Sequence, residues 1–142
     1  MAREGLFMSA RIKDKIKEIE QYLEELEEIK PSTFKEYRRN FKTRAACERY
    51  VEKIIEAVTD LAFLVIKDRA LALPEEDKEA FDILAKGGII EEILATKLKE
   101  AKGMRNILAH QYGRVDDELV FASINEELNR DVTDFVLAIK KM

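Results

Sequence analysis

The sequence predicts an all-α fold, an antiparallel bundle of four or five helices. Apolar residues recur three or four positions apart through most of the 142 residues, which is the spacing of one helix face. No stretch alternates apolar and polar residues with a period of two, so no sheet is expected. Only five glycines and two prolines interrupt the chain. Its length predicts one domain, residues 1–142, with 1–8 as a loose N-terminus.

The first helix is expected from about Ser9 to Ile29. An apolar stripe with steps of three and four residues runs along it, and the opposite face is strongly acidic. The acidic face is interpreted as a solvated surface, because its carboxylates fan around the helix and do not converge on a metal. The stripe consists of Met8, Ile12, Ile16, Ile19, Leu23 and Leu26.

A second, long helix is expected between the two prolines. The pattern from Thr33 to Glu36 is a capping box that begins it, and Pro74 ends it after Leu73. Its first half is basic and aromatic. Its second half, 54–66, is rich in apolar residues and is expected to be the most buried element of the bundle.

A third helix is expected to begin with Pro74 in its first position and to end at the pair Gly87-Gly88, which is typical of a C-cap. A fourth begins near Ile89. Gly103 lies within it, where a glycine permits close approach of another backbone such as that of a partner subunit. The side chains expected to face inward are Ile90, Ile93, Leu94, Leu98, Ala101, Met104, Ile107 and Leu108.

The fifth helix is expected to be capped by Asp116 and to run to the end of the chain. Its inward stripe again follows helical spacing. The residues of this stripe are Val120, Ile124, Leu128, Val132, Phe135 and Ile139.

The charge of the chain is unevenly distributed. A net charge of −4 argues mildly against a nucleic-acid binder. However, Lys35–Lys53 and Lys97–Arg114 each carry +4, and the remainder carries −12. Such runs are usually solvated faces. Two basic segments in an acidic chain can also line one groove for a polyanion.

Composition argues against several classes of protein. Cys47 is the single cysteine, so no intrachain disulfide is possible. One histidine, one cysteine and scattered carboxylates offer no metal-ligand spacing, so neither a metal nor a cofactor is expected. No signal peptide precedes the first helix, and no apolar run approaches the roughly 18 residues of a membrane span. A cytoplasmic protein without a membrane partner is expected.

The stretch Lys99–Arg114, KEAKGMRNILAHQYGR, combines three side chains suited to handling a phosphodiester. Arg105 is permanently charged and binds phosphate oxygens with a planar fork. His110, the only histidine, can transfer a proton near neutral pH. Tyr112 offers a hydroxyl that can donate or accept a hydrogen bond or be modified.

Helical spacing alone does not bring these side chains together. Asn106 and His110 share a face, but Arg105 and His110 differ by about 140° around the helix axis. They converge if the arginine arches around the helix, if the helix loosens near Gly113, or if a second chain supplies the partner. Spacing alone favours an ordinary helix end, with His110 complementing the dipole and Gly113 as a left-handed cap.

The order Arg105, four residues, His110, one residue and Tyr112 resembles the signature of HEPN-domain proteins, specifically the HepT type of toxin from prokaryotic toxin–antitoxin pairs. The resemblance spans roughly residues 11–139, and it reverses the preference for an ordinary helix end. It is also carried by Asn106, Ile107 and Leu108, by the lead-in Ile83-Leu84 and Gly87-Gly88-Ile89-Ile90, and by Arg44, Glu48 and Arg49 in the second helix.

The resemblance implies a HEPN-like bundle with metal-independent endoribonuclease activity on an RNA such as tRNA or mRNA. For attack by the RNA 2′-hydroxyl, Arg105 is suited to stabilise the phosphoryl oxygens and His110 to transfer protons. Asn106 is suited to orient His110 or to hold a phosphate. The basic residues expected to bind RNA are Lys42, Arg44, Arg49, Lys99, Lys102 and Arg114.

The resemblance also implies two protein partners. One is a second copy of the chain, because a pair of catalytic histidines requires a homodimer with both motifs at one cleft. The other is a cognate minimal nucleotidyltransferase antitoxin that attaches AMP to Tyr112. A nucleotide there would block the cleft and add negative charge where an RNA phosphate must sit.

Two other functions remain open from the residues alone. One is a nucleotide-binding module that uses Arg105 and His110 without catalysis. The other is a helical adaptor whose function lies in one exposed face of the bundle.

Overall fold

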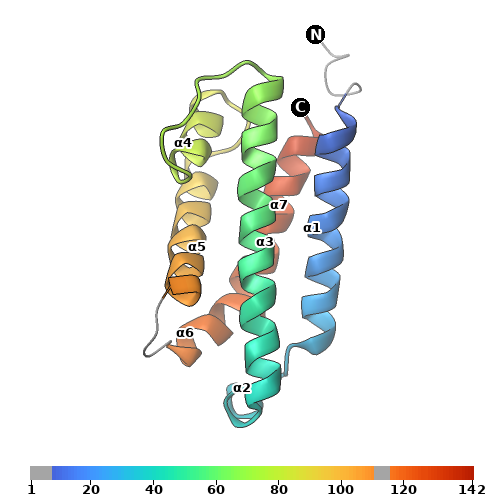
Figure 1. Cartoon of the computed structure of the whole chain (residues 1–142), viewed down its shortest axis with the longest axis vertical. Coiled ribbons are helices and arrows are strands. Elements are labelled where there is room, and N and C mark those ends of the chain that lie inside the picture. Colours follow the sequence, from blue (N-terminus) through green and yellow to red (C-terminus); the bar gives the residue numbers. More distant parts are fainter. Residues whose placement is uncertain (1–7, 111–115) are drawn as a thin grey trace.

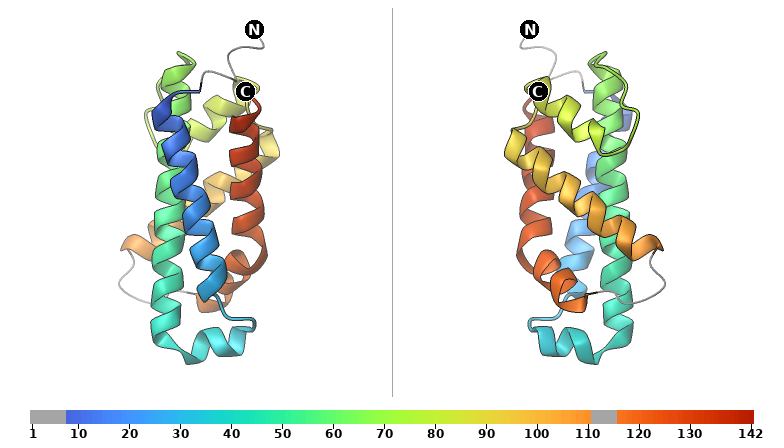
Figure 2. Two further views of the ribbon diagram at one scale, coloured as in Figure 1. Left: turned by 90° about the vertical axis from the view of Figure 1, so that its right-hand side faces the viewer. Right: turned by 90° about the vertical axis from the view of Figure 1, so that its left-hand side faces the viewer.

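The computed structural model describes residues 8–110 and 116–142, which form an up-down-up-down arrangement of helices (Figure 1). In Figure 1, α3 runs up the front, α1 lies on one side of it, α5 on the other, and α7 behind. Figure 2 shows α5 crossing the bundle obliquely. No strand occurs in the described residues. The elements are α1 Ala10–Ile29, α2 Phe34–Arg39, α3 Phe41–Asp68, α4 Glu79–Lys86, α5 Glu92–His110, α6 Asp117–Ala122, the π-helical turn η2 Ser123–Glu127, and α7 Leu128–Lys140.

The first helix agrees with its prediction. Ser9 is the N-cap of α1, and its Oγ accepts a hydrogen bond from the backbone N–H of Ile12 at 3.2 Å. The helix ends at Ile29 as expected. The stripe buries Ile12, Ile16, Ile19, Leu23 and Leu26, which pack onto α3.

The second predicted helix is wrong as a single element, because the chain breaks at Asn40. This residue has φ −103° and ψ 98°, outside the helical region. Its Oδ1 accepts from the backbone N–H groups of Lys42 and Thr43, each at 3.1 Å, so it caps α3. Thr33 caps the short α2 as expected, accepting from the N–H of Glu36 at 3.2 Å.

The central helix α3 is the most buried element, as predicted, but it ends at Asp68 rather than Leu73. Ala70 adopts φ 53°, in the left-handed region. The N–H groups of Ala70 and Leu71 then bond back to the carbonyls of Lys67 and Ile66 at 3.2 and 2.9 Å. This is a Schellman cap built without glycine, at a cost of about 1–2 kcal/mol for an L-residue.

The prediction that Pro74 begins the third helix is wrong. Helix α4 begins at Glu79, and Lys78 before it makes no side-chain capping bond. The predicted glycine cap is confirmed. Gly88 has φ 74°, and the N–H of Ile89 bonds to the carbonyl of Leu84 at 3.0 Å.

Helix α5 begins at Glu92, later than the predicted Ile89, and its buried face is rotated from the prediction. Ile93 and Ile107 are 67% and 49% exposed, so their predicted inward placement is wrong. Ile90 and Leu98 are buried as predicted. Ala95 and Lys102, which were not predicted to face inward, are buried as well, because α5 packs against α3, α4 and α7 with this face.

The helix continues without a break through Gly103. A Cβ at Gly103 would have only Lys78 Nζ within 4 Å, at 3.5 Å, so no other backbone of the described chain approaches it closely. The predicted cap at Gly113 lies outside the described residues.

The C-terminal segment agrees with its prediction except for one turn. Asp116 caps α6, with its Oδ1 accepting from the N–H of Leu119 at 3.1 Å. Five residues, Ser123–Glu127, then form a π-helical turn before α7. All six predicted inward residues are buried, namely Val120, Ile124, Leu128, Val132, Phe135 and Ile139.

Candidate functional site

The predicted catalytic residues lie in the last two turns of α5. Arg105 and Asn106 are within the helix, and His110 is its final residue. The side chain of His110 lies outside the described part of the chain, as do Tyr112 and Arg114 entirely. The backbone places Asn106 and His110 one helical turn apart on one face.

Arg105 extends from α5 toward α3 with a side chain only 20% exposed. Its Nη1 donates to Oδ1 of Asn106 at 3.4 Å, and its Nη2 lies 3.5 Å from Oε2 of Glu56 on α3. Its Nε is buried and has no hydrogen-bond partner among the described residues. A cation with unused donors in a sheltered position is suited to receive an anionic oxygen.

Sequence reasoning missed Glu56. A sequence signal does exist, since Glu48, Glu52 and Glu56 follow one another at four-residue intervals and share a face of α3. The pattern does not show which residue of α5 lies opposite Glu56, because that depends on how α5 crosses α3.

The predicted second-helix cluster forms a polar connection between α3 and α6. Arg44 Nε lies 3.7 Å from Oδ2 of Asp117, and a guanidinium nitrogen of Arg44 also donates to the carbonyl of Arg38. Burial raises the pKa of Glu48, and the nearby Asp117 carboxylate raises it further. Burial also raises the pKa of the Cys47 thiol to about 11. The cluster therefore fixes the start of α6, just beyond residues 111–115.

The predicted RNA-binding residues fall into two groups. Lys42 is exposed, and so is Arg49, whose Nη1 lies 3.2 Å from Glu52 Oε2. On α5, Lys99 pairs with Asp82 of α4 at 3.0 Å, and Lys102, with its side chain 7% exposed, pairs with Asp77 at 3.3 Å. The structure therefore does not join the two basic segments into one band of free cations among the described residues.

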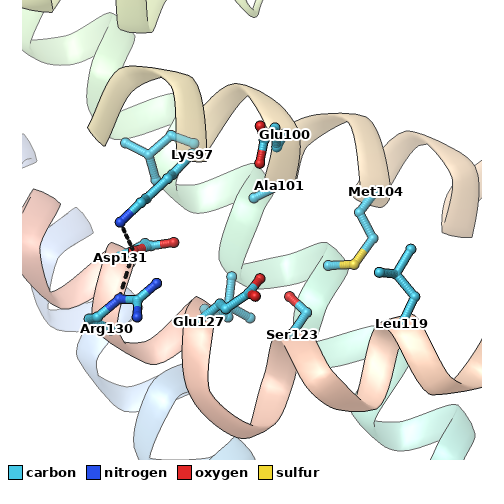
Figure 3. A pocket seen from close by; sticks show the side chains of 11 residues that line it. Lys97, Glu100, Ala101, Met104, Leu119, Ser123, Glu127, Arg130 and Asp131 are labelled. Atoms are coloured by element: carbon cyan, nitrogen blue, oxygen red, sulfur yellow. Dashed lines mark hydrogen bonds and ion pairs between the residues drawn. The ribbon is translucent and has the colours of Figure 1, made fainter. Parts of the chain in front are cut away.

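A groove of about 300 Å³ lies between α5 and the run α6–η2–α7 (Figure 3). The side chains of Met104 and Leu119 meet at one end of it, and Leu119 is 59% exposed. At the other end Asp131 lies 3.2 Å from Arg130 Nε and 4.0 Å from Lys97 Nζ. The lining residues are Lys97, Leu98, Glu100, Ala101, Met104, Leu119, Ser123, Glu127, Leu128, Arg130 and Asp131.

Among the described residues, no three or more His, Cys, Asp and Glu side chains are grouped so that they could hold a metal ion. None of the helices in that part of the chain is both long and apolar enough to cross a membrane.

Comparison with known proteins gives a consistent result. The family described as Ribonuclease HepT-like matches residues 19–139. The "mRNA nuclease HepT" of Shewanella oneidensis is 25% identical over 105 residues, 74% of this chain and 78% of that protein. The "tRNA nuclease HepT" of Aphanizomenon flos-aquae is 26% identical over 119 residues, 84% of this chain and 81% of that protein.

A protein of Archaeoglobus fulgidus is 42% identical over 72 residues, which are 51% of this chain and 54% of that relative, so the match spans about half of its length. Among solved structures, a tri-AMPylated HEPN toxin of Shewanella oneidensis in complex with an MNT antitoxin has the same fold. Its TM-score is 0.88 at 23% identity, covering 95% of this chain and 100% of that one.

Proposed function

The chain belongs to the HepT-like ribonuclease family, and from this we propose that it is a metal-independent endoribonuclease toxin whose site is built on Arg105 and His110. The observation that carries the proposal is the placement of Arg105. Its guanidinium is sheltered between α5 and α3, and its Nε has no partner among the described residues. It lies on the same helix as His110, five residues before it.

The proposed chemistry is attack by a ribose 2′-hydroxyl on the adjacent phosphodiester. A base removes the hydroxyl proton, the 2′-oxygen bonds to phosphorus, and the bond to the 5′-oxygen breaks as that oxygen takes up a proton. The products are a 2′,3′-cyclic phosphate and a 5′-hydroxyl. Arg105 stabilises the charge that grows on the phosphoryl oxygens, and His110 transfers protons. Asn106 contacts Arg105 and helps to hold it.

RNA is proposed to approach the site over the exposed cations of α3. Lys42 and Arg49 are exposed there, and Arg44 is half-buried. Lys102 contributes less, because its side chain is 7% exposed and pairs with Asp77. Arg49 and Lys99 each already pair with one carboxylate, that of Glu52 and that of Asp82. Binding through phosphate contacts should weaken steeply as salt rises. One of the two HepT relatives is named an mRNA nuclease and the other a tRNA nuclease, so their names give two different classes of RNA substrate.

A second copy of the chain is the proposed partner for catalysis, because one chain supplies one histidine. The α5–α6 face, defined by Met104, Ile107 and Leu119, supports this. Ile107 and Leu119 are large apolar residues, 49% and 59% exposed, on the elements that flank the motif. The groove beside them carries both signs of charge, with Lys97 and Arg130 against Glu100, Glu127 and Asp131. A face of mixed charge can complement its own copy across a two-fold axis.

The proposed regulator is a nucleotidyltransferase antitoxin that adds AMP to Tyr112. The solved relative with the same fold is itself a tri-AMPylated toxin in complex with an MNT antitoxin. In this chain Tyr112 is two residues from His110, so a nucleotide on its hydroxyl would add negative charge beside the site.

The experiment that tests the function is digestion of total RNA by the purified chain in the presence of EDTA. Fragments ending in a 2′,3′-cyclic phosphate are expected. Mononucleotide binding without cleavage would favour a nucleotide-binding module instead, and cleavage only with an added divalent metal would contradict the mechanism.

A further inference from the structure

Among the described residues, the partner of Arg105 across the bundle is one carboxylate, that of Glu56. It comes from α3, 49 residues earlier in the chain, and its Oε2 lies 3.5 Å from Arg105 Nη2. Glu56 stands on the most buried helix of the bundle, with Ile55 and Ala57 on either side of it in the core. The carboxylate is therefore mounted on a rigid support, whereas the guanidinium is at the end of a long side chain.

The contact between Glu56 and Arg105 is weak enough to exchange. A distance of 3.5 Å and a Glu56 side chain that is 56% exposed describe a weak ion pair. Glu56 and Asn106 engage two of the five N–H donors of Arg105 within the described residues. The other three have no partner among these residues, and one of them, Nε–H, is buried. An arginine side chain carries about 2 kcal/mol of rotamer entropy. A fixed partner therefore lowers the entropy that the side chain loses when it binds a substrate phosphate.

We infer that Glu56 is a positioning residue for Arg105. It holds the guanidinium across the face of α3 while the site is empty, and it yields part of that contact to a phosphate oxygen of the RNA. The inference rests on the proposed ribonuclease function, and it adds a residue from a different helix to the motif of α5. Glu56 does not touch the reacting atoms in this role, and its effect passes through Arg105.

The chain offers a matched control one helical turn earlier. Glu52 is on the same face of α3, but it pairs with Arg49 at 3.2 Å and is not the partner of Arg105. Glu56→Gln and Glu52→Gln each remove one negative charge near the proposed RNA path, so both should leave RNA affinity equal or slightly tighter. Only Glu56→Gln should slow turnover, by roughly tenfold, because a displaced guanidinium no longer meets the phosphoryl oxygen.

The test is steady-state cleavage of an RNA oligonucleotide by wild type, Glu56→Gln, Glu56→Asp and Glu52→Gln. A fall in kcat without a rise in KM is expected for Glu56→Gln, with partial recovery in Glu56→Asp and no change in Glu52→Gln. In the Arg105→Lys background, Glu56→Gln should add no further loss. Equal losses of kcat in Glu56→Gln and Glu52→Gln would overturn the inference. So would a loss of kcat from Glu56→Gln that is as large in the Arg105→Lys background as in wild type.

A second measurement separates this inference from the proposed function. Nitrogen-15 relaxation of the Arg105 Nε–H group reports the order of the guanidinium whether or not RNA is cleaved. That order should fall in Glu56→Gln and stay in Glu52→Gln. If wild type cleaves no RNA, the ribonuclease proposal fails, and unchanged order in Glu56→Gln would then also refute the positioning role.

Discussion

The guanidinium of Arg44 lies 3.7 Å from the carboxylate of Asp117, so the start of the central helix is joined to the first residue of α6. Glu48 lies one turn along α3 from Arg44. Two carboxylates thus share one cation in a partly buried setting. This arrangement has a consequence for the pH dependence of stability.

Glu48→Gln is expected to raise the melting temperature at pH 7. Burial, followed by the Asp117 charge, raises the pKa of Glu48 above 4.5, so the folded state disfavours its ionised form. For a carboxyl group with a raised pKa, the cost to stability is absent well below pH 4.5, grows as pH rises above the unfolded-state pKa, and is complete above the folded-state pKa. The gain in the variant should therefore vanish in acid. Thermal melts from pH 3 to 8 test this, with Glu52→Gln as the control. A gain that persists in acid would contradict it.

Tyr37→Phe is expected to stabilise the fold or leave it unchanged. The ring of Tyr37 is fully buried against Phe34 and Phe121, and its hydroxyl has no hydrogen-bond partner among the described residues. Removing an unpaired buried hydroxyl should gain about 1 kcal/mol. Tyr22→Phe is the contrast, because its hydroxyl donates to Glu18 at 3.0 Å. Urea denaturation measures both. A clear loss in Tyr37→Phe would show that the hydroxyl is satisfied after all.

Arg105→Ala and His110→Ala are each expected to abolish RNA cleavage and toxicity while the helical content remains. Losing one positioned proton-transfer group or one phosphate-facing cation typically costs a hundredfold to ten-thousandfold, about 3–5 kcal/mol of barrier. Digestion assays in EDTA and circular dichroism of the same samples test the two parts. Wild-type rates in His110→Ala would refute the assignment of this site.

Ile107→Glu is expected to separate the proposed dimer and to lower cleavage with it. A carboxylate on the α5–α6 face would be buried without a partner against the second copy. Leu137→Glu is the matched control, since Leu137 is 45% exposed but lies on α7 and is not part of the α5–α6 face. Sedimentation equilibrium at micromolar concentration gives the association state. A wild-type chain that is strictly monomeric there would remove the dimer proposal.

Tyr112→Phe is expected to keep cleavage and to escape silencing. The phenyl ring preserves the side chain's bulk but lacks the hydroxyl to which AMP would be attached. Mass spectrometry after incubation with the cognate nucleotidyltransferase and ATP should show added AMP on wild type and none on the variant. Modification of the variant at an unchanged level would place the acceptor elsewhere.

Much of the fold could be predicted because long apolar stripes report burial directly. The stripes of α1 and of the C-terminal segment needed no other information. The break at Asn40 was hidden, because asparagine both tolerates a helix and caps one, and only the packing of α2 against α6 decides between them. The cap at Ala70 was hidden because the sequence there has no glycine.

The site was predictable only in part. The motif in α5 could be recognised from its order along the chain, but the partner of Arg105 could not, since Glu56 meets it through the crossing of two helices. The same crossing turns Lys102 inward and Ile107 outward, against their chemical preferences. Sequence periodicity cannot show this rotation, because α5 is apolar on more than one side.

The π-helical turn at Ser123–Glu127 determines how the chain would respond to the deletion of one residue. Val120, Ile124, Leu128 and Val132 are all four apart and all buried, although a step of four overshoots a full α-helical turn by about 40°. The wider turn accommodates one residue more than an α-helix would, and so returns the stripe to the core. Loss of a single codon there would restore a regular α-helix and leave α6 and α7 on nearly the same faces, because Val120 and Val132 would then be eleven residues apart, about 20° beyond three full turns. Val120 would therefore stay in the core. The π-helical turn thus absorbs one residue without changing which side chains α6 and α7 bury, and the segment should tolerate the loss of that residue.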